Sequence, residues 1–127
     1  MIRPDGSATI IQPQESLALF ATGYYSMYWT SHQPSNHSWQ VADSEKIARF
    51  NASLFNGGTY KISGSVLETR ADVAQVPMFT SGSATFRMAF SADTLVLTGI
   101  NVVSVDGVQH PLYAGGGHVV NKLVKAR

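Results

Sequence analysis

The stretch from Gly58 to Val105 reads GTYKISGSVLETRADVAQVPMFTSGSATFRMAFSADTLVLTGINVVSV and determines the fold that we expect. Small residues around a glycine at Ser63–Ser65 separate two strand-like segments, which is typical of a hairpin turn. A second return is expected between Ala74 and Gly82, where Pro77 ends a ladder of hydrogen bonds. A third turn is expected at Ser91–Thr94. The stretch therefore predicts consecutive antiparallel strands joined by three hairpins.

Each turn fixes which residues face one another across the expected sheet. The expected neighbours are Ile62 with Leu67, Tyr60 with Thr69, Arg70 with Arg87, Ala71 with Phe86, Phe90 with Leu95, and Met88 with Leu97. Because side chains alternate between the two faces of a strand, these registers gather the apolar residues on one face. That face is predicted to hold Tyr60, Ile62, Leu67, Thr69, Ala71, Val73, Ala84, Phe86, Met88, Phe90, Leu95 and Leu97. Burying it contributes about 25 cal/mol per Å² of apolar area, whereas the opposite, largely charged face is expected to be solvated.

The composition is that of a folded chain with few charges. The 127 residues are 44% hydrophobic and 13% charged, which predicts a single globular domain over residues 1–127. A net charge of +1 gives no reason to expect nucleic acid or an anionic membrane as a partner. The chain has no cysteine, which excludes disulfides, a thiolate nucleophile and a zinc–thiolate site. MIRPDGSATI lacks the apolar core of a signal peptide, and no segment has the roughly 20 apolar residues of a membrane span, so we expect a soluble cytoplasmic protein.

The beginning of the chain predicts three further strands. They are Ser7–Gln12, Leu17–Ala21 and Tyr24–Thr30, with a tight turn at Thr22-Gly23 between the last two. Pairing Ala21 with Tyr24 gathers one set of side chains on one side of this hairpin: Ala18, Phe20, Tyr25, Met27 and Trp29. The other side is apolar as well. We select Tyr25, Met27 and Trp29 as inward-facing because they belong to the larger continuous apolar set.

Residues 31–42 (SHQPSNHSWQVA) show no periodicity and contain many turn-forming residues, which predicts a loop. His32 and His37 raise the question of a metal site. Their spacing matches no common ligand pattern, so a solvated loop is favoured, and we expect neither a metal nor a cofactor.

A helix is predicted over Asp43–Phe55. Asp43 or Ser44 is its expected cap, and Asn56-Gly57-Gly58 is its expected stop. An apolar stripe falls at i, i+3 and i+7 on Ile47, Phe50 and Leu54. We expect this stripe to lie against the sheet, in preference to serving as an interaction helix.

Asp106-Gly107 is the strongest hairpin signal of the chain. It predicts the pairs Val105 with Val108, Val103 with His110, and Asn101 with Leu112. Alternation carried forward from Leu97 then puts Asn101 and His110 on the inner side, as in a ligand cavity with a few orienting polar groups. Two other interpretations remain open: Gly99 marks a bulge that turns both side chains outward, or the two side chains only bond each other.

A last strand is predicted at His118–Lys125, after a glycine-rich connection that lacks the Lys-Ser/Thr of a phosphate loop. The sequence therefore predicts an all-β fold, an antiparallel barrel of about eight to nine strands with one short α-helix. A sandwich is the alternative. A barrel of about eight strands has an interior just wide enough for side chains or for one small ligand.

Three segments resemble the bacterial lipocalin-like domain family. LALFATGYYSMYW (residues 17–29) is similar to that family's extended strand, turn and "GYYS"-type strand. NGGTYKISGSVLETRADVAQVP (residues 56–77) is similar to its "aGtYevsGntLttr" segment, and FSADTLVLT (residues 90–98) to its "dgDtLtLt" hairpin. The resemblance covers roughly Ser7 to Thr98 and implies a calycin-like barrel with an internal pocket, but no catalytic residues.

The resemblance has one departure at the start of the sequence. Members of the family usually open with a "GtWkLvs" strand before the region similar to SATIIQ, and this sequence shows none. We therefore expect a barrel that is open on one side, completed by another chain, or shortened at its start. Because an uncovered strand edge favours pairing between chains, a homodimer is among the expected partners.

Three classes of function are compatible with the sequence. The first is binding of a small hydrophobic or aromatic molecule in the barrel, with ligand-binding candidates Tyr25, Met27, Trp29, Tyr60, Thr69, Phe86, Met88, Leu97, Asn101 and His110. The second is an enzyme such as a cyclase or isomerase of a natural product, which holds its substrate in the same pocket with His110 as candidate acid or base. The third is a non-catalytic dimeric structural protein with a filled barrel.

Overall fold

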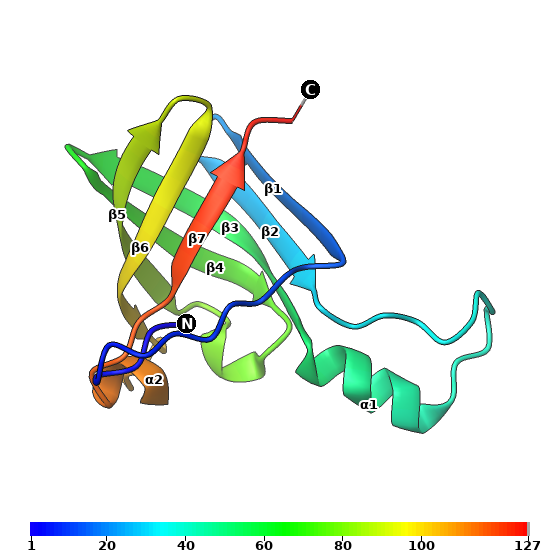
Figure 1. Cartoon of the computed structure of the whole chain (residues 1–127). Helices are drawn as coiled ribbons and strands as arrows, with labels where there is room; N and C mark the ends of the chain where they lie inside the picture. Colours follow the sequence, from blue (N-terminus) through cyan, green and yellow to red (C-terminus); the bar gives the residue numbers. More distant parts are fainter. Residues whose placement is uncertain (127) are drawn as a thin grey trace.

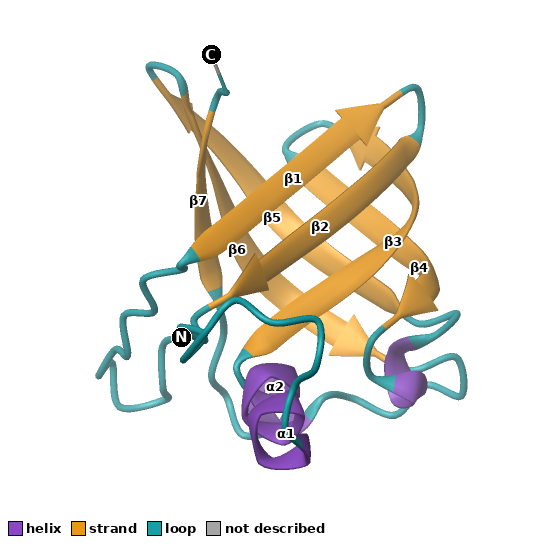
Figure 2. Cartoon of the chain, turned by 90° about the vertical axis from the view of Figure 1, so that its right-hand side faces the viewer, coloured by secondary structure: helices purple, strands orange, loops and turns teal. Residues whose placement is uncertain are grey.

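The computed structural model describes residues 1–126 as an antiparallel, nearly closed β-barrel (Figures 1 and 2). Its strands are β1 (Glu15–Ala21), β2 (Tyr24–Thr30), β3 (Ser53–Ser63), β4 (Val66–Ala74), β5 (Ser83–Ser91), β6 (Thr94–Val103) and β7 (Val120–Val124). The helices are α1 (Asp43–Asn51), the 3-10 helix η1 (Pro77–Phe79) and α2 (Pro111–Ala114). Each strand pairs with the next in the chain, and within residues 1–126 no ladder joins β1 to β7. The described chain thus has seven strands where eight to nine were predicted.

The connections differ between the two ends of the barrel. The tight turns β1–β2, β3–β4 and β5–β6 lie at one end, here called the hairpin end. The long loop 31–42, α1, η1 and α2 lie at the other, here called the helical end (Figure 1). At the first turn Thr22 has a φ of 47° and Gly23 a φ of 84°, as a two-residue hairpin loop requires.

The predicted apolar face is the inner wall of the barrel, except for Val73, which lies beyond the β3–β4 bulge and is exposed. Leu67, Ala84, Phe86 and Leu97 form its buried cluster. Partly buried side chains pack against this cluster: Phe20, Tyr60, Phe79, Met88, Leu95, Val102 and Leu123. On β2, Tyr25 and Met27 are buried whereas Tyr24 is exposed, so the choice of inner side for that strand is confirmed.

Most of the predicted registers are confirmed. Ile62 lies opposite Leu67, Phe90 opposite Leu95, and Ala21 opposite Tyr24. The β4–β5 register is wrong, since Arg87 faces Val66 and Arg70 faces Ser83. The connection contains η1, and the ladder already ends at Arg70, so no tight turn fixes the register there. The partner of Arg87 on β4 is thus displaced by four residues, from the predicted Arg70 to Val66. Because side chains alternate with a period of two, an even displacement leaves the same side chains on each face.

Two expectations for the first half of the chain are wrong. Residues 7–12 form no strand, and the N-terminal segment is attached instead through bridges from Ile2 to Ala8 and to His118. Helix α1 ends at Asn51 and follows Ala42, without a side-chain cap from Asp43.

The last residues of the predicted helix and the glycines expected to stop it belong to strand β3 instead. Gly57 and Gly58 lie within β3 beside a bulge. A Cβ at Gly58 would overlap the carbonyl oxygen of Arg70, and one at Gly57 would lie 3.1 Å from the carbonyl oxygen of Tyr25. The glycines thus permit a close approach of neighbouring strands rather than ending a helix.

The predicted packing of α1 against the sheet is also wrong. No residue of α1 is buried, and Ile47 and Phe50 are exposed to 62% and 50%. Leu54, the third member of the predicted stripe, belongs to β3 instead. Without it the helix has no continuous apolar face, and α1 extends away from the barrel at the helical end (Figures 1 and 2).

A bulge in β6 changes which side chains face inward near its end. Gly99 lies opposite Phe86 and Asn101 opposite Thr85, so Ile100 is the extra residue. Beyond the bulge Val102 packs against the core, and the neighbouring Asn101 points outward. This is the bulge interpretation that the sequence left open at Gly99.

The turn at Asp106-Gly107 exists, but its register differs from the predicted one by one residue. Val103 bridges to Gln109 rather than to His110, and the amide of Ser104 donates to the carbonyl of Val108 at 2.9 Å. His110 is exposed and precedes α2, where its Nδ1 accepts a hydrogen bond from the amide of Leu112 at 3.1 Å. The placement of His110 inside the barrel was therefore wrong.

Candidate functional site

Eight of the ten predicted ligand-binding residues lie together along the inner wall. Tyr25, Met27, Thr69, Phe86 and Leu97 are buried, and Trp29, Tyr60 and Met88 are partly buried. Asn101 and His110 lie outside this group, and Asn101 Oδ1 accepts from its neighbour Val102 and from Gln109. An acid–base role for His110 stays a prediction, and it would have to act outside the barrel.

A small polar group is buried within the apolar inner wall. The hydroxyl of Tyr25 donates to Asn56 Oδ1 at 2.7 Å, and both residues are buried. The hydroxyl of Thr69, buried as well, donates to the carbonyl of Ala84 at 3.5 Å. Burial raises the pKa of Tyr25, while a hydrogen bond with the Thr69 hydroxyl acts in the opposite sense. Tyr25 is therefore a neutral donor at physiological pH.

Asn56 is a member of this polar group that the sequence did not reveal. It precedes Gly57-Gly58, and the three residues together were interpreted as a helix stop. The signal that would have found it is the strand alternation from Tyr60 back through Gly58 to Asn56, which puts all three side-chain positions on one face.

The inner wall becomes accessible at the hairpin end. Ile62 and Phe90 belong to the inward-facing set, yet they are 57% and 75% exposed because they lie at the strand ends. Just inside them, the rings of Phe20 and Tyr60 meet edge to face with their centroids 5.4 Å apart. The hairpin end therefore presents an apolar rim that leads to partly exposed aromatic side chains.

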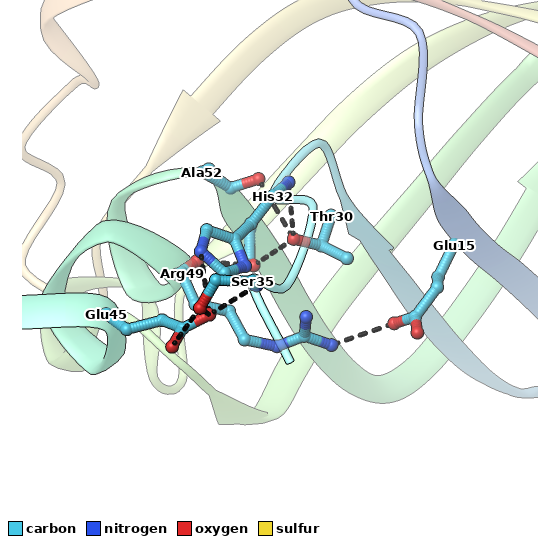
Figure 3. Close-up of polar contacts among 8 residues, drawn as sticks. Glu15, Thr30, His32, Ser35, Glu45, Arg49 and Ala52 are labelled. Atoms are coloured by element: carbon cyan, nitrogen blue, oxygen red, sulfur yellow. Dashed lines mark hydrogen bonds and ion pairs between the residues drawn. The ribbon is translucent and has the colours of Figure 1, made fainter. Parts of the chain in front are cut away.

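A second group of polar side chains connects loop 31–42 and α1 to the barrel (Figure 3). Its centre is Thr30, which is completely buried at the end of β2. The Thr30 hydroxyl accepts from the amide of His32 at 3.1 Å and from the hydroxyl of Ser53 at 2.7 Å. It donates to the carbonyl of Ala52 at 3.4 Å. These bonds attach both ends of the long connection to the same point of the barrel.

The charged members of this group belong to two separate contacts. Arg49 Nη2 donates to Glu15 Oε2 at 2.8 Å and to the hydroxyl of Tyr28 at 2.9 Å. Glu45 Oε1 accepts from the amide of Ser35 at 3.0 Å. That backbone hydrogen bond is the main reason why the pKa of Glu45 is lowered.

A cavity of about 260 Å³ lies between these two contacts. Its lining comes from β1, the loop and α1: Glu15, His32, Pro34, Asn36, His37, Ser38, Val41, Glu45 and Arg49. A second hollow of about 360 Å³ adjoins it and is lined by His37, Ser38 and Trp39. Sequence reasoning did not find this site, because its residues converge through the tertiary attachment at Thr30 rather than through any motif. In the described part of the chain, no three His, Cys, Asp or Glu side chains lie close enough to hold a metal ion.

The chain was compared with known proteins, and no protein family, no curated protein and no solved structure matches it. None of the helices within residues 1–126 has the length and apolar character required to cross a membrane.

Proposed function

We propose that the barrel binds a small hydrophobic or aromatic molecule that enters at the hairpin end. The observation that carries this proposal is the exposure of inward-facing apolar side chains at that end, Ile62 and Phe90, above the partly exposed rings of Phe20 and Tyr60. Covering 100 Å² of such surface contributes about 2.5 kcal/mol. Burial of apolar surface at the hairpin end thus gives a guest molecule a substantial free energy of binding.

The buried polar group gives the proposed site a means of orientation. Tyr25, Asn56 and Thr69 lie on the same inner wall, deeper than the rim. Ligand pockets commonly combine an apolar lining with a few such groups. We expect the preferred guest to be mostly apolar, with at most one or two hydrogen-bonding atoms. A lipocalin-like identity for the chain is part of this proposal, and its support is the antiparallel, nearly closed barrel.

Fluorescence titration with 1-anilinonaphthalene-8-sulfonate tests the proposal. The dye should bind saturably, and Tyr60→Ser should weaken binding about tenfold, the equivalent of about 1.4 kcal/mol of lost contact. Tyr24→Ser is the matched control, because Tyr24 neighbours this segment on the exposed outer face and should leave the affinity unchanged. Near-UV circular dichroism of both variants verifies that the fold is retained. Equal effects of the two substitutions, or no saturable binding, would contradict the proposal.

A further inference from the structure

The cavity at the helical end is separate from the proposed barrel site. It lies between loop 31–42, the beginning of β1 and the exposed helix α1. It shares the lining residues His37 and Ser38 with the hollow beside Trp39, so the two open depressions are neighbours. Both spaces are open to solvent, and the one lined by Glu45 has a volume of about 260 Å³, slightly below the usual range for sites that hold a small organic molecule.

The charges that line the cavity leave one negative charge without a permanent counter-charge. Arg49 is neutralised by Glu15 at 2.8 Å. Glu45 forms no ion pair with Lys or Arg within residues 1–126, and its nearest basic atom is His32 Nε2 at 3.9 Å, which is charged only when protonated. The Glu45 side chain is only 19% exposed, and its hydrogen-bond donors are the amide and hydroxyl of Ser35, which are neutral.

A neighbouring aromatic side chain is suited to a cation as well. Trp39 is fully exposed beside the cavity, so both faces of its indole are free. The face of an indole attracts an ammonium group through the ring quadrupole and also packs against apolar groups.

We infer that this cavity is a second binding site, for a small organic cation with an ammonium group directed at Glu45 and an apolar part against Trp39. An organic anion would meet two carboxylates, Glu15 and Glu45, with only one guanidinium, which is already paired. A metal ion lacks a set of three ligands among the described residues. The net negative lining and the adjacent free indole thus favour an amine of modest size.

Three aromatic probes of similar size and different charge test this inference: benzylammonium, benzyl alcohol and benzoate. Each is titrated into the whole ¹⁵N-labelled chain at pH 7, and the indole N–H signal of Trp39, assigned with Trp39→Phe, is followed. Benzylammonium should shift this signal saturably and bind at least tenfold more tightly than benzyl alcohol, with benzoate weakest. Glu45→Gln keeps the shape and the Ser35 acceptor but removes the charge, and it should weaken benzylammonium at least tenfold.

Glu68→Gln is the matched control, since Glu68 is exposed on β4 and should leave the affinity unchanged. Equal binding of the three probes, tighter binding of benzoate, or an unchanged affinity in Glu45→Gln would overturn the inference. So would shifts confined to the signals of Trp29 and Tyr60, which would assign the probe to the barrel instead. If Glu45→Gln did not fold, the order of the three probes with the native chain would decide the matter alone.

Discussion

Replacing Gly58 by alanine perturbs the point where strands β3 and β4 come closest. The new Cβ would overlap the Arg70 carbonyl oxygen and lie 2.7 Å from the amide nitrogen of Asp72, both of which are backbone atoms. Arg70 also pairs with Ser83 on the next strand, so the backbone is restrained on its other side. Overpacking of this kind costs about 1–3 kcal/mol and occasionally more. With two backbone overlaps, we expect the free energy of unfolding to fall by about 3 kcal/mol, at the upper end of that range.

Two other glycines provide matched controls for this substitution. In Gly57→Ala the Cβ lies 3.1 Å from the nearest backbone oxygen, so a shift of a few tenths of an ångström relieves the contact, at a cost of about 1 kcal/mol. In Gly64→Ala the Cβ meets nothing within 4 Å, but a φ of 59° costs about 1–2 kcal/mol for a residue with a side chain. Both losses should be smaller than that of Gly58→Ala.

Urea unfolding followed by tryptophan fluorescence measures all three changes. With a slope of about 2 kcal/mol per M, a loss of 3 kcal/mol lowers the midpoint by about 1.5 M. The controls should lower it by about 0.5 to 1 M. If Gly58→Ala has a midpoint no lower than that of Gly64→Ala, β3 and β4 do not approach each other as described.

Three further substitutions test the inner wall and the attachment of the long loop. Leu67→Ala should cost about 2–5 kcal/mol, whereas Leu19→Ala on the exposed outer face should change stability by about 0.5 kcal/mol or less, both by urea unfolding. Tyr25→Phe leaves Asn56 Oδ1 without its donor and should cost about 1–3 kcal/mol at pH 7. Folding raises the pKa of Tyr25, so the contribution of this residue to the free energy of unfolding is complete below about pH 10 and declines as the pH rises further. The stability of Tyr25→Phe should therefore fall less steeply with alkaline pH than that of the native chain. An equally steep fall would contradict this assignment. Thr30→Val leaves the partly buried amide of His32 without its acceptor and should cost about 1–3 kcal/mol, with faster amide hydrogen exchange in the loop that follows; native exchange rates there would refute the attachment.

Local signals sufficed for the parts of the fold in which neighbouring residues determine the geometry. The turns at Thr22-Gly23 and Gly64 contain residues that adopt positive φ, and their registers were predicted correctly. The β4–β5 register was not, because the connection through η1 has no such turn to fix it. The apolar face was predicted nonetheless, since the error was an even number of residues.

Two of the remaining errors arise at glycines, because a glycine can end an element or permit close packing within one. Gly58 was interpreted as the end of a helix, but it permits close packing inside a strand. Gly99 lies at a bulge that reverses the alternation, and its missing side chain makes room for Tyr113 of α2. Only the neighbouring strand or helix distinguishes these uses, and that neighbour is distant in the sequence. Asn101 was placed on the inner wall for this reason, whereas His110 is exposed because the chain leaves the ladder there and begins α2.

The cavity at the helical end depends on tertiary structure to a greater degree still. Residues 31–42 have no periodicity, and His32 and His37 were assigned to a solvated loop. The fold brings them to Glu15 and Arg49 because the buried Thr30 attaches the loop to the barrel. A single buried hydroxyl at a strand end carries no signal of that role in the sequence.

The proposed binding site requires that the exposed apolar side chains of the hairpin end belong to the inside of the barrel and contact a guest molecule there. The outer face offers a competing apolar surface at Leu17 and Leu19, which are both exposed. Intermolecular nuclear Overhauser effects between 1-anilinonaphthalene-8-sulfonate and methyl-labelled protein distinguish the two surfaces. A guest inside the barrel should give effects at Met88 and Leu95 on the inner wall and none at Leu17 and Leu19. Effects confined to Leu17 and Leu19 would contradict it.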